Sequence, residues 1–405
     1  MKHPSSHEER QPLLAARRDA KMATSAHRYV RGSTQRFYEW LATTRGRSLP
    51  EGPRIWICGD CHVGNLGPVA RADGRVELEL RDLDQTVIGN PCHDVIRLAL
   101  SLAMTARASD LPGIVTAHMV EAVVVGYEAA IANRIRRRGA AAESSRPLRL
   151  IMKQAARRSW KHLIDERVGQ TERIIPVGKR FWKLTAAERK AVDLLFEKES
   201  LRTLVTSLSS RPDDAAVEVV DAAFWIKGCS SLGGWRCAAL VRTAGTAKTR
   251  PSVSLIDIKE ALPACAPRAA KTGMPRHNGE RVVTGARHLS PFLGERMIHE
   301  TILERPVFIR ELLPQDLKIE LEAVTEGEAS GVAAHLGRIV GDAHARQLTR
   351  DQAKSWLAAL RAGYSKTIEA PTWLWRSMVD LVGIHESAYL EHCRRHAVTA
   401  RAPSA

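Results

Sequence analysis

The sequence predicts an α+β protein with a large helical lobe and a smaller lobe built on an antiparallel sheet. Residues 218–322 contain short apolar runs of strand type, separated by glycine and proline. Both ends of the chain instead carry apolar residues at helical spacing. With 405 residues, 44 % of them hydrophobic, the chain is long and apolar enough for a sizeable core in two or three packed layers or lobes.

The first 106 residues are expected to form N-terminal helices followed by an acidic hairpin. Helical spacing between residues 11 and 41 predicts two helices that break near Gly32. An alternating run at 55–57 stops at Gly59, and a second run at 77–80 leads into Asp82 and Asp84. We interpret the two runs as a hairpin-like pair of strands with a turn at residues 72–74, which brings the acidic ends together. A helix at 92–106 follows.

The polar residues of this segment favour phosphate chemistry. Asp60, His62 and Asn65 follow the first strand among glycines, and Asp82 follows the second. Carboxylate and amide oxygens are the ligands of a hard cation, and a carboxylate also serves as a base.

The next block, residues 107–217, is expected to be mainly helical, and its role is not indicated. A long helix at 111–135 ends in a cluster of arginines that complements the helix dipole. A basic helix is expected at 148–167. Thr185 and Glu188 form a capping box that opens another helix, which runs to residue 196.

Residues 218–322 are expected to form the sheet. Strands at 222–226 and 235–241 flank a loop that contains Gly228, Ser230, Ser231 and Gly233, and a third strand at 252–259 ends in Lys259. Glycines allow backbone N–H groups to approach an anion, so this loop is a candidate phosphate-covering loop. Taken alone, a hairpin with a glycine turn is the commoner explanation.

Residues 323–405 are expected to be helices that complete the helical lobe. A helix at 331–347 carries His344, whose default interpretation is a satisfied helix-face histidine. Apolar residues continue at helical spacing through several tryptophans to Tyr389.

The charge and the cysteines limit the classes of partner and site. Sixty-one basic against 45 acidic residues leave a formal charge of +16, but few aromatics stand among the basic residues to stack bases. A nucleotide is therefore the expected acidic partner, and nucleic acid is not. Seven irregularly spaced cysteines do not resemble a disulfide framework, and no apolar run is long enough to span a membrane. The expected location is the cytoplasm.

The segment from Cys58 to His62 also matches the attachment motif of c-type haem. That haem is attached outside the cytoplasm, and the N-terminus lacks the apolar core of an export signal. Zinc bound by Cys58, Cys61, Cys92 and His93 is a further alternative, although structural zinc sites usually combine two CxxC-like pairs. A redox pair is weaker still, because its CxxC should open a helix.

Three spaced motifs carry a resemblance to known proteins. Gly59-Asp60-x-His62-x-x-Asn65, then Asp82-x-Asp84, then the run from Gly89 to Ala99 with Asp94, resembles the catalytic half of the aminoglycoside and choline phosphotransferases. Those enzymes belong to the protein-kinase-like superfamily.

Most of the chain is also similar to the bacterial domain-of-unknown-function family 2252. That similarity includes the segment Arg28-Tyr-Val-Arg-Gly32, whose arginines could reach a phosphate.

The kinase-like resemblance implies a two-lobed fold and an ATP- and magnesium-dependent phosphotransferase that acts on an unknown hydroxyl-bearing acceptor. Asp60 would be the base, His62 would brace its loop, and Asn65 and Asp82 would hold magnesium. Asp94 would hold the catalytic loop from a helix start, and Asp84 would hold the turn.

In the sheet lobe, Lys259 would pair the ATP phosphates, with a helix at 278–289 supplying Glu280 as its partner. The end of the strand at 306–313, where the chain leaves for a linker, would present backbone groups of Glu311 and Leu313 to adenine. Because the acidic loop here precedes the lysine, the resemblance implies a circularly permuted chain. A regulatory nucleotide-binding protein without transfer activity and an AMP-transferring enzyme remain as alternatives.

Overall fold

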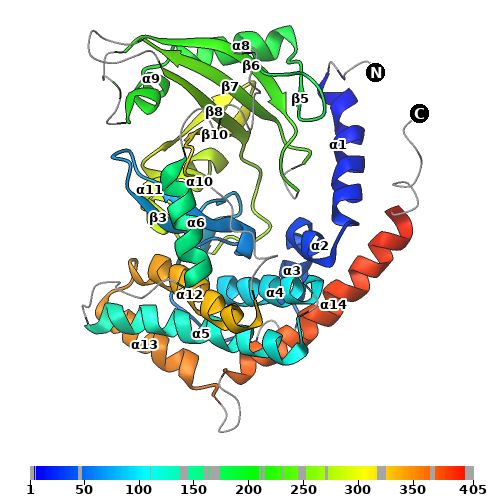
Figure 1. The fold of residues 1–405 in the computed structure, drawn as a ribbon, viewed down its shortest axis with the longest axis vertical. Helices are drawn as coiled ribbons and strands as arrows, with labels where there is room; N and C mark the ends of the chain where they lie inside the picture. Colours follow the sequence, from blue (N-terminus) through cyan, green and yellow to red (C-terminus); the bar gives the residue numbers. More distant parts are fainter. Residues whose placement is uncertain are drawn as a thin grey trace.

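The protein combines a six-stranded antiparallel sheet with a region of packed helices, as the computed structural model in Figure 1 shows. The α+β class predicted from the sequence is therefore confirmed. The structure describes residues 4, 6–43, 48–109, 111–136, 145–158, 163, 174–208, 211, 215–229, 232–244, 252–269, 272–316, 325–364 and 370–396.

The large sheet has the strand order β5-β6-β7-β8-β10-β9. Its strands are β5 (Phe181–Trp182), β6 (Val217–Trp225), β7 (Arg236–Thr243), β8 (Ser252–Glu260), β9 (Met297–Ile302) and β10 (Arg305–Leu312). The expected strands near 222–226, 235–241, 252–259 and 306–313 are all present. The sheet also includes β5, which lies within the 107–217 block.

Strand β9 was not predicted, because its turn lacks the usual sequence signal. Leu303 and Glu304 connect β9 to β10 as a two-residue loop, and their φ angles are 49° and 62°. Two positive φ angles are the requirement of a type I′ hairpin turn, which glycine and asparagine normally satisfy. Here bulkier residues adopt the same backbone.

Helices α8 (Ala186–Phe196) and α9 (Glu199–Thr206) cover one face of the sheet (Figure 1). The predicted capping box is present, with Thr185 as N-cap of α8 and Glu188 at its third position. The Glu188 carboxylate also accepts hydrogen bonds of 2.7 and 3.0 Å from Arg10 and of 2.9 Å from Trp235 Nε1. Arg10 belongs to α1 (His7–Met22), so this carboxylate fixes the N-terminal helix to the sheet.

The helical region lies on the other side of the molecule. It contains α2 (Ala26–Gly32), α3 (Thr34–Leu41), α4 (Cys92–Ala108), α5 (Gly113–Arg136), α12 (Glu326–Ala345), α13 (Arg350–Arg361) and α14 (Thr372–His396). Helix α12 begins five residues earlier than predicted, because Thr325 and Glu328 form a capping box there. Helix α6 (Arg146–Arg157) runs beside this region, and the expected helix at 148–167 extends past the described residues.

Helices α5 and α12 cross at very short range. A Cβ at Gly126 would lie 1.8 Å from the carbonyl oxygen of Ala334, and a Cβ at Gly337 would lie 2.1 Å from that of Val123. By length and composition α5 could cross a membrane, but 56 % of its most apolar window is buried inside the protein. A core helix of a soluble protein has the same features.

The last part of α14 lies against the C-terminal end of α1 and against α2 (Figure 1). His392 Nε2 is 2.8 Å from the carbonyl oxygen of Asp19, and the Tyr389 hydroxyl donates to that of Ala23 at 3.3 Å. The rings of Tyr389 and Tyr29 are 6.0 Å apart. Helix α14 thus packs along α1 and α2.

The acidic hairpin is real, but its strand pairing differs from the prediction. Strand β3 (Val76–Leu80) pairs with β2 (Leu66–Ala70), whereas β1 (Ile55–Ile57) pairs with β4 (Val87–Gly89). The glycine and proline within residues 66–70 concealed β2 in the sequence. The turn at 72–74 is confirmed, with Gly74 at a φ of 86°.

Candidate functional site

The loop at residues 59–65, proposed from the sequence to be catalytic, begins at Gly59, where the backbone leaves β1. Gly59 has a φ of 75°, and a Cβ there would lie 2.2 Å from the carbonyl oxygen of Gln85, so only glycine fits. Asp94, in the first turn of α4, accepts the backbone N–H groups of Cys58 at 2.7 Å and Gly59 at 2.9 Å. The expectation that Asp94 holds this loop is confirmed.

A chain of buried polar groups supports Asp94 from behind. His344 Nε2 on α12 lies 3.1 Å from Asp94 Oδ2, and its Nδ1 lies 2.9 Å from the Tyr127 hydroxyl on α5. Trp356 Nε1 on α13 donates to that hydroxyl at 3.1 Å. The sequence indicated no partner for His344, because its two partners, Asp94 and Tyr127, come from distant helices.

Asp60 lies in the loop as a buried carboxylate paired with Arg97 of α4. Burial raises the pKa of Asp60, and the Arg97 guanidinium opposes the rise without cancelling it. Arg97 is fully buried and also lies over the Phe37 ring, at 5.4 Å from its centroid. The loop therefore holds an ionisable group whose environment favours the uptake of a proton.

His62 follows Asp60 after one intervening residue, and its side chain is buried. Its Nδ1 has no hydrogen-bond partner among the described residues. Burial, followed by the charge of Arg31, lowers the pKa of His62 well below its usual value. The imidazole is therefore neutral at physiological pH.

Asn65 and Asp82 lie next to each other, as predicted. Leu66 and Leu80 are paired residues of β2 and β3, so Asn65 immediately precedes one strand and Asp82 follows the other. Asn65 Nδ2 donates to the carbonyl oxygen of Asp60 at 2.9 Å and to that of Asp82 at 3.4 Å. This orientation turns the amide oxygen of Asn65 away from those carbonyls.

Lys259, far downstream in the sequence, lies against the same hairpin. It is buried at the end of β8, forms an ion pair with Asp84 and lies 3.8 Å from Asp82 Oδ1. The sequence separation between Lys259 and Asp84 is 175 residues. Partial loss of hydration would raise the pKa of Asp82, but the charges of Lys259 and then Arg310 outweigh it and lower that pKa. The side chain of Asp82 remains 49 % exposed.

Two more arginines share the sheet face of Lys259. Arg236 is paired with Lys259 across β7 and β8, and Arg310 is paired with Asp257 across β10 and β8. Arg236 donates to both carboxylate oxygens of buried Asp257 at 2.7 and 2.5 Å, and Arg310 lies 3.4 Å away. Burial would raise the pKa of Asp257, but Arg236 and Arg310 lower it to about 2. On this face three cations thus lie close to the carboxylates of Asp257, Asp82 and Asp84.

The expected glutamate partner of Lys259 is replaced by the hairpin carboxylates. Glu280 does lie in the first turn of α10 (Asn278–Leu289), but the ion pairs of Lys259 within the described ranges are with Asp82 and Asp84. The neighbouring Arg281 is buried and donates to the carbonyl oxygens of Asp84 at 3.0 Å and of Thr86. Helix α10 therefore contacts the backbone that follows β3 through the hydrogen bonds of Arg281.

The glycine loop between β6 and β7 contacts the N-terminal helix. Gly228 and Gly233 have φ angles of 111° and 119°, which favour glycine. Lys21 Nζ donates to the carbonyl oxygen of Gly228 at 2.6 Å, and Gln11 Nε2 to that of Gly233 at 2.7 Å. Ser230 and Ser231 lie outside the described residues.

The two predicted adenine-contacting residues already have partners in the chain. The Glu311 carboxylate accepts bonds of 2.9 and 2.6 Å from Arg211, and its carbonyl oxygen accepts one of 2.9 Å from Arg296. The backbone N–H of Leu313 donates to Asp316 at 3.2 Å. An adenine contact at either residue stays a prediction and would require these bonds to be shared or exchanged.

The family of the chain follows from a match that spans nearly its whole length. The model of the family described as "Uncharacterized protein conserved in bacteria (DUF2252)" matches residues 10–395. The chain belongs to the DUF2252 family. No curated protein and no solved structure matches this DUF2252 protein.

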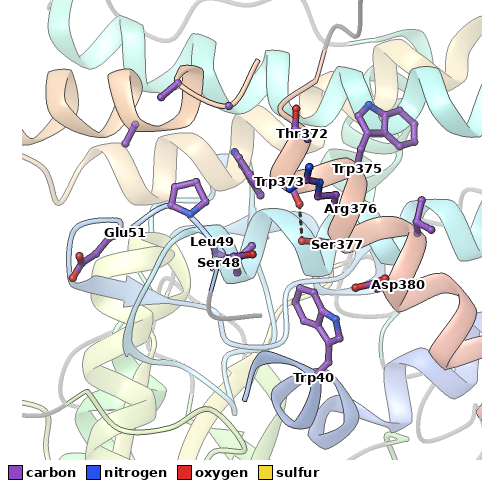
Figure 2. A pocket seen from close by; sticks show the side chains of 15 residues that line it. Trp40, Ser48, Leu49, Glu51, Thr372, Trp373, Trp375, Arg376, Ser377 and Asp380 are labelled. Carbon is purple, nitrogen blue, oxygen red and sulfur yellow. Dashed lines mark hydrogen bonds between the residues drawn. The ribbon is translucent and has the colours of Figure 1, made fainter. Parts of the chain in front are cut away.

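A separate pocket of about 980 Å³ opens in the helical region of the DUF2252 protein (Figure 2). It lies between α3, residues 48–51 and the end of α13 with the start of α14, and its walls include Trp40, Trp373 and Arg376. None of the site residues described above lines this pocket. The residues around Lys259 therefore belong to a different part of the protein from this pocket.

The cysteine motif of this DUF2252 protein is buried and protonated. A hydrogen bond to Cys61, then burial, raises the pKa of Cys58 well above its usual value, so the thiolate needed for redox chemistry is disfavoured. In the part of the chain that the structure describes, no three or more His, Cys, Asp or Glu side chains are placed to hold a metal. Cys58, Cys61, Cys92 and His93, all of them described, are therefore not placed together as four metal ligands.

Proposed function

We propose that this protein is an ATP- and magnesium-dependent phosphotransferase of the kinase-like superfamily, which acts on a hydroxyl-bearing acceptor. One observation carries the proposal. Lys259, at the end of the third long strand of the sheet, meets Asp82 and Asp84 of a hairpin that lies 175 residues earlier. A phosphate-pairing lysine and a metal-binding aspartate must meet in this way around one nucleotide.

The order of elements supports a permuted kinase-like fold with two lobes. Strand β6, the glycine loop, β7, the lysine-bearing β8, helix α10 and the β9–β10 pair follow one another as the resemblance requires. The catalytic loop and its metal-binding hairpin precede them. Contact between α14 and the N-terminal helices is the arrangement expected of new chain ends, which would have been contiguous in the unpermuted chain.

The residues present fit a magnesium site to which the protein contributes two oxygen ligands. The exposed carboxylate of Asp82 and the amide oxygen of Asn65 supply two oxygen ligands, and magnesium usually takes its other ligands from water and phosphates. When bound, magnesium would neutralise charge on the β- and γ-phosphates of ATP. Lys259 would bind phosphate oxygens, assisted by backbone groups of the loop that contains Gly228, Ser230, Ser231 and Gly233.

The transfer itself requires a base and an aligned acceptor. The acceptor oxygen would form a bond to the γ-phosphorus while the bond from that phosphorus to the β,γ-bridging oxygen breaks and ADP leaves. The acceptor proton would pass to the Asp60 carboxylate, whose raised pKa favours its uptake, and later to water. Arg97 would keep the carboxylate oriented, and neutral His62 would brace the loop.

A regulatory nucleotide-binding protein is the second candidate. It is favoured by the partner of Lys259, which is Asp84 of the hairpin where an active kinase-like site uses a helix glutamate. Such a protein would bind MgATP without transferring phosphate. An AMP-transferring enzyme would instead attach the α-phosphate of ATP, and not the γ-phosphate, to the acceptor.

One labelling experiment separates these candidates. The purified protein is incubated with a bacterial metabolite extract, magnesium and ATP labelled at either the γ- or the α-phosphate. We expect γ-label in a new small molecule, and its loss with Asp82→Asn and Asp60→Asn but not with the exposed control Asp351→Asn. α-Label in the product would indicate AMP transfer, and ATP binding without any labelled product would favour the regulatory protein.

A further inference from the structure

A group of cations without acidic partners lies between the glycine loop and the catalytic loop. Lys21 is at the end of α1, and Arg28 and Arg31 are on α2. None of the three forms an ion pair within the described ranges. Lys21 and Arg28 donate only to neutral oxygens, at 2.6 Å to Gly228 and 2.9 Å to Thr24.

Arg31 reaches directly over the catalytic loop. An ideal Cβ at Gly64 would lie 3.1 Å from Arg31 Cζ and 3.2 Å from Cε1 of His62. Two polar atoms here are buried and lack a partner among the described residues, namely Nε of Arg31 and Nδ1 of the nearly fully buried His62. The guanidinium is thus placed beside the residues that follow Asp60.

Among the residues that the structure describes, no ion pair balances the positive charge of this group. Burial, then the charges of Arg31 and Arg28, lowers the pKa of nearby His27 to about 4. The neighbouring imidazoles are therefore uncharged, and the same arginines lower the pKa of Lys21 after burial. Cations held together without counter-charges repel one another, and a bound anion would relieve the repulsion.

We propose that Lys21, Arg28 and Arg31 bind the anionic group of the acceptor, so that the acceptor is an alcohol carrying a phosphate monoester. This inference rests on the phosphotransferase proposed above. The nucleotide phosphates already have Lys259 and magnesium, whereas Arg31 lies on the side of Asp60 and His62, where the acceptor hydroxyl must enter. Three cations with two planar guanidinium groups suit the dianionic, multidentate phosphate group.

Calorimetric titration with inorganic phosphate tests this assignment in the full-length protein. One titration is performed with saturating MgADP and another with a non-hydrolysable MgATP analogue. We expect phosphate to bind in both, and Arg31→Gln and Arg28→Gln each to weaken it about tenfold. Arg107→Gln, which removes an exposed arginine paired with Glu386 elsewhere, should leave it unchanged. MgADP affinity should be the same in all four proteins.

Other results would overturn the inference in distinguishable ways. Phosphate binding with MgADP but not with the MgATP analogue would assign the cations to the γ-phosphate of the nucleotide. Normal MgADP binding, with no phosphate binding or with none that depends on the arginines, would refute the acceptor site alone. Arginine-dependent phosphate binding without MgADP binding would support the anion site and contradict the phosphotransferase. Because Arg28 is exposed, its variant keeps the test valid if Arg31→Gln does not fold.

Discussion

The burial of each residue in the candidate site determines whether its substitution would affect folding, chemistry or both. Asp60, Asp94 and Asp257 are buried and each has a charged or hydrogen-bonding partner, so changing them affects folding as well as chemistry. Asp82 is half-exposed and is held mainly by its place in the hairpin. It is therefore the residue at which chemistry and stability can be tested apart.

Asp82→Asn should abolish function without unfolding the protein. The amide cannot neutralise a cation, so we expect the transfer rate to fall about a hundredfold or more. The lost contact with Lys259 spans 3.8 Å and is partly solvated, so the free energy of unfolding should change by no more than about 1 kcal/mol. γ-Phosphate transfer and urea unfolding measure the two quantities, and a large stability loss with an intact rate would contradict the role of Asp82.

Asp257 should make stability depend on acid pH. Its pKa is about 2 in the folded protein, against an ordinary 3.8, so its ionised form stabilises the fold above pH 4. That contribution, about 2 kcal/mol, is lost as the pH falls from about 4 through about 2. Asp257→Asn should be less stable than the wild type at pH 7 by at least this amount. Urea unfolding between pH 7 and 2 should show the two proteins converging, and parallel curves would be inconsistent with the prediction.

At the level of elements, the crossing of α5 and α12 supports the site from below. These helices carry Tyr127 and His344, whose hydrogen bonds hold Asp94 and through it the loop at residues 59–65. The close approach depends on glycines, because side chains at Gly126 or Gly337 would meet backbone atoms of the other helix. Packing in the helical region is thus coupled to the geometry of the loop.

Gly126→Ala should therefore destabilise the protein by about 3 kcal/mol, since the new Cβ meets backbone that cannot move alone. The matched control is Gly383→Ala in α14, where a Cβ meets nothing within 4 Å. This exposed helical substitution should instead stabilise the fold by about 0.5–1 kcal/mol. Thermal unfolding of both variants gives the comparison, and equal effects at the two positions would show that the crossing is not close.

At the scale of the whole molecule, sequence patterns predicted single helices and strands better than they predicted the contacts between them. Period-2 and helical spacing located β8, β10, α4 and α10, and the capping box located α8, because these signals lie within one element. The partner strand of β3 was misassigned, since pairing is decided between elements. Likewise, the sequence showed Lys259 at a strand end but not that Asp84 would pair with it. His344 and Arg281 are tertiary contacts with no local signature, so only the folded chain reveals them.

If Lys259 and the acidic hairpin share one nucleotide, as we propose, ATP binding should depend on magnesium and on both of these groups. Calorimetry is performed on the wild type, Lys259→Met, Asp82→Asn, the double variant and the surface control Lys354→Met. We expect each site variant to weaken MgATP binding about tenfold or more, and the double variant to lose less than the sum, because both residues act on one ligand. Absence of binding by the wild type at millimolar MgATP, or binding unaffected by either site variant, would contradict the account.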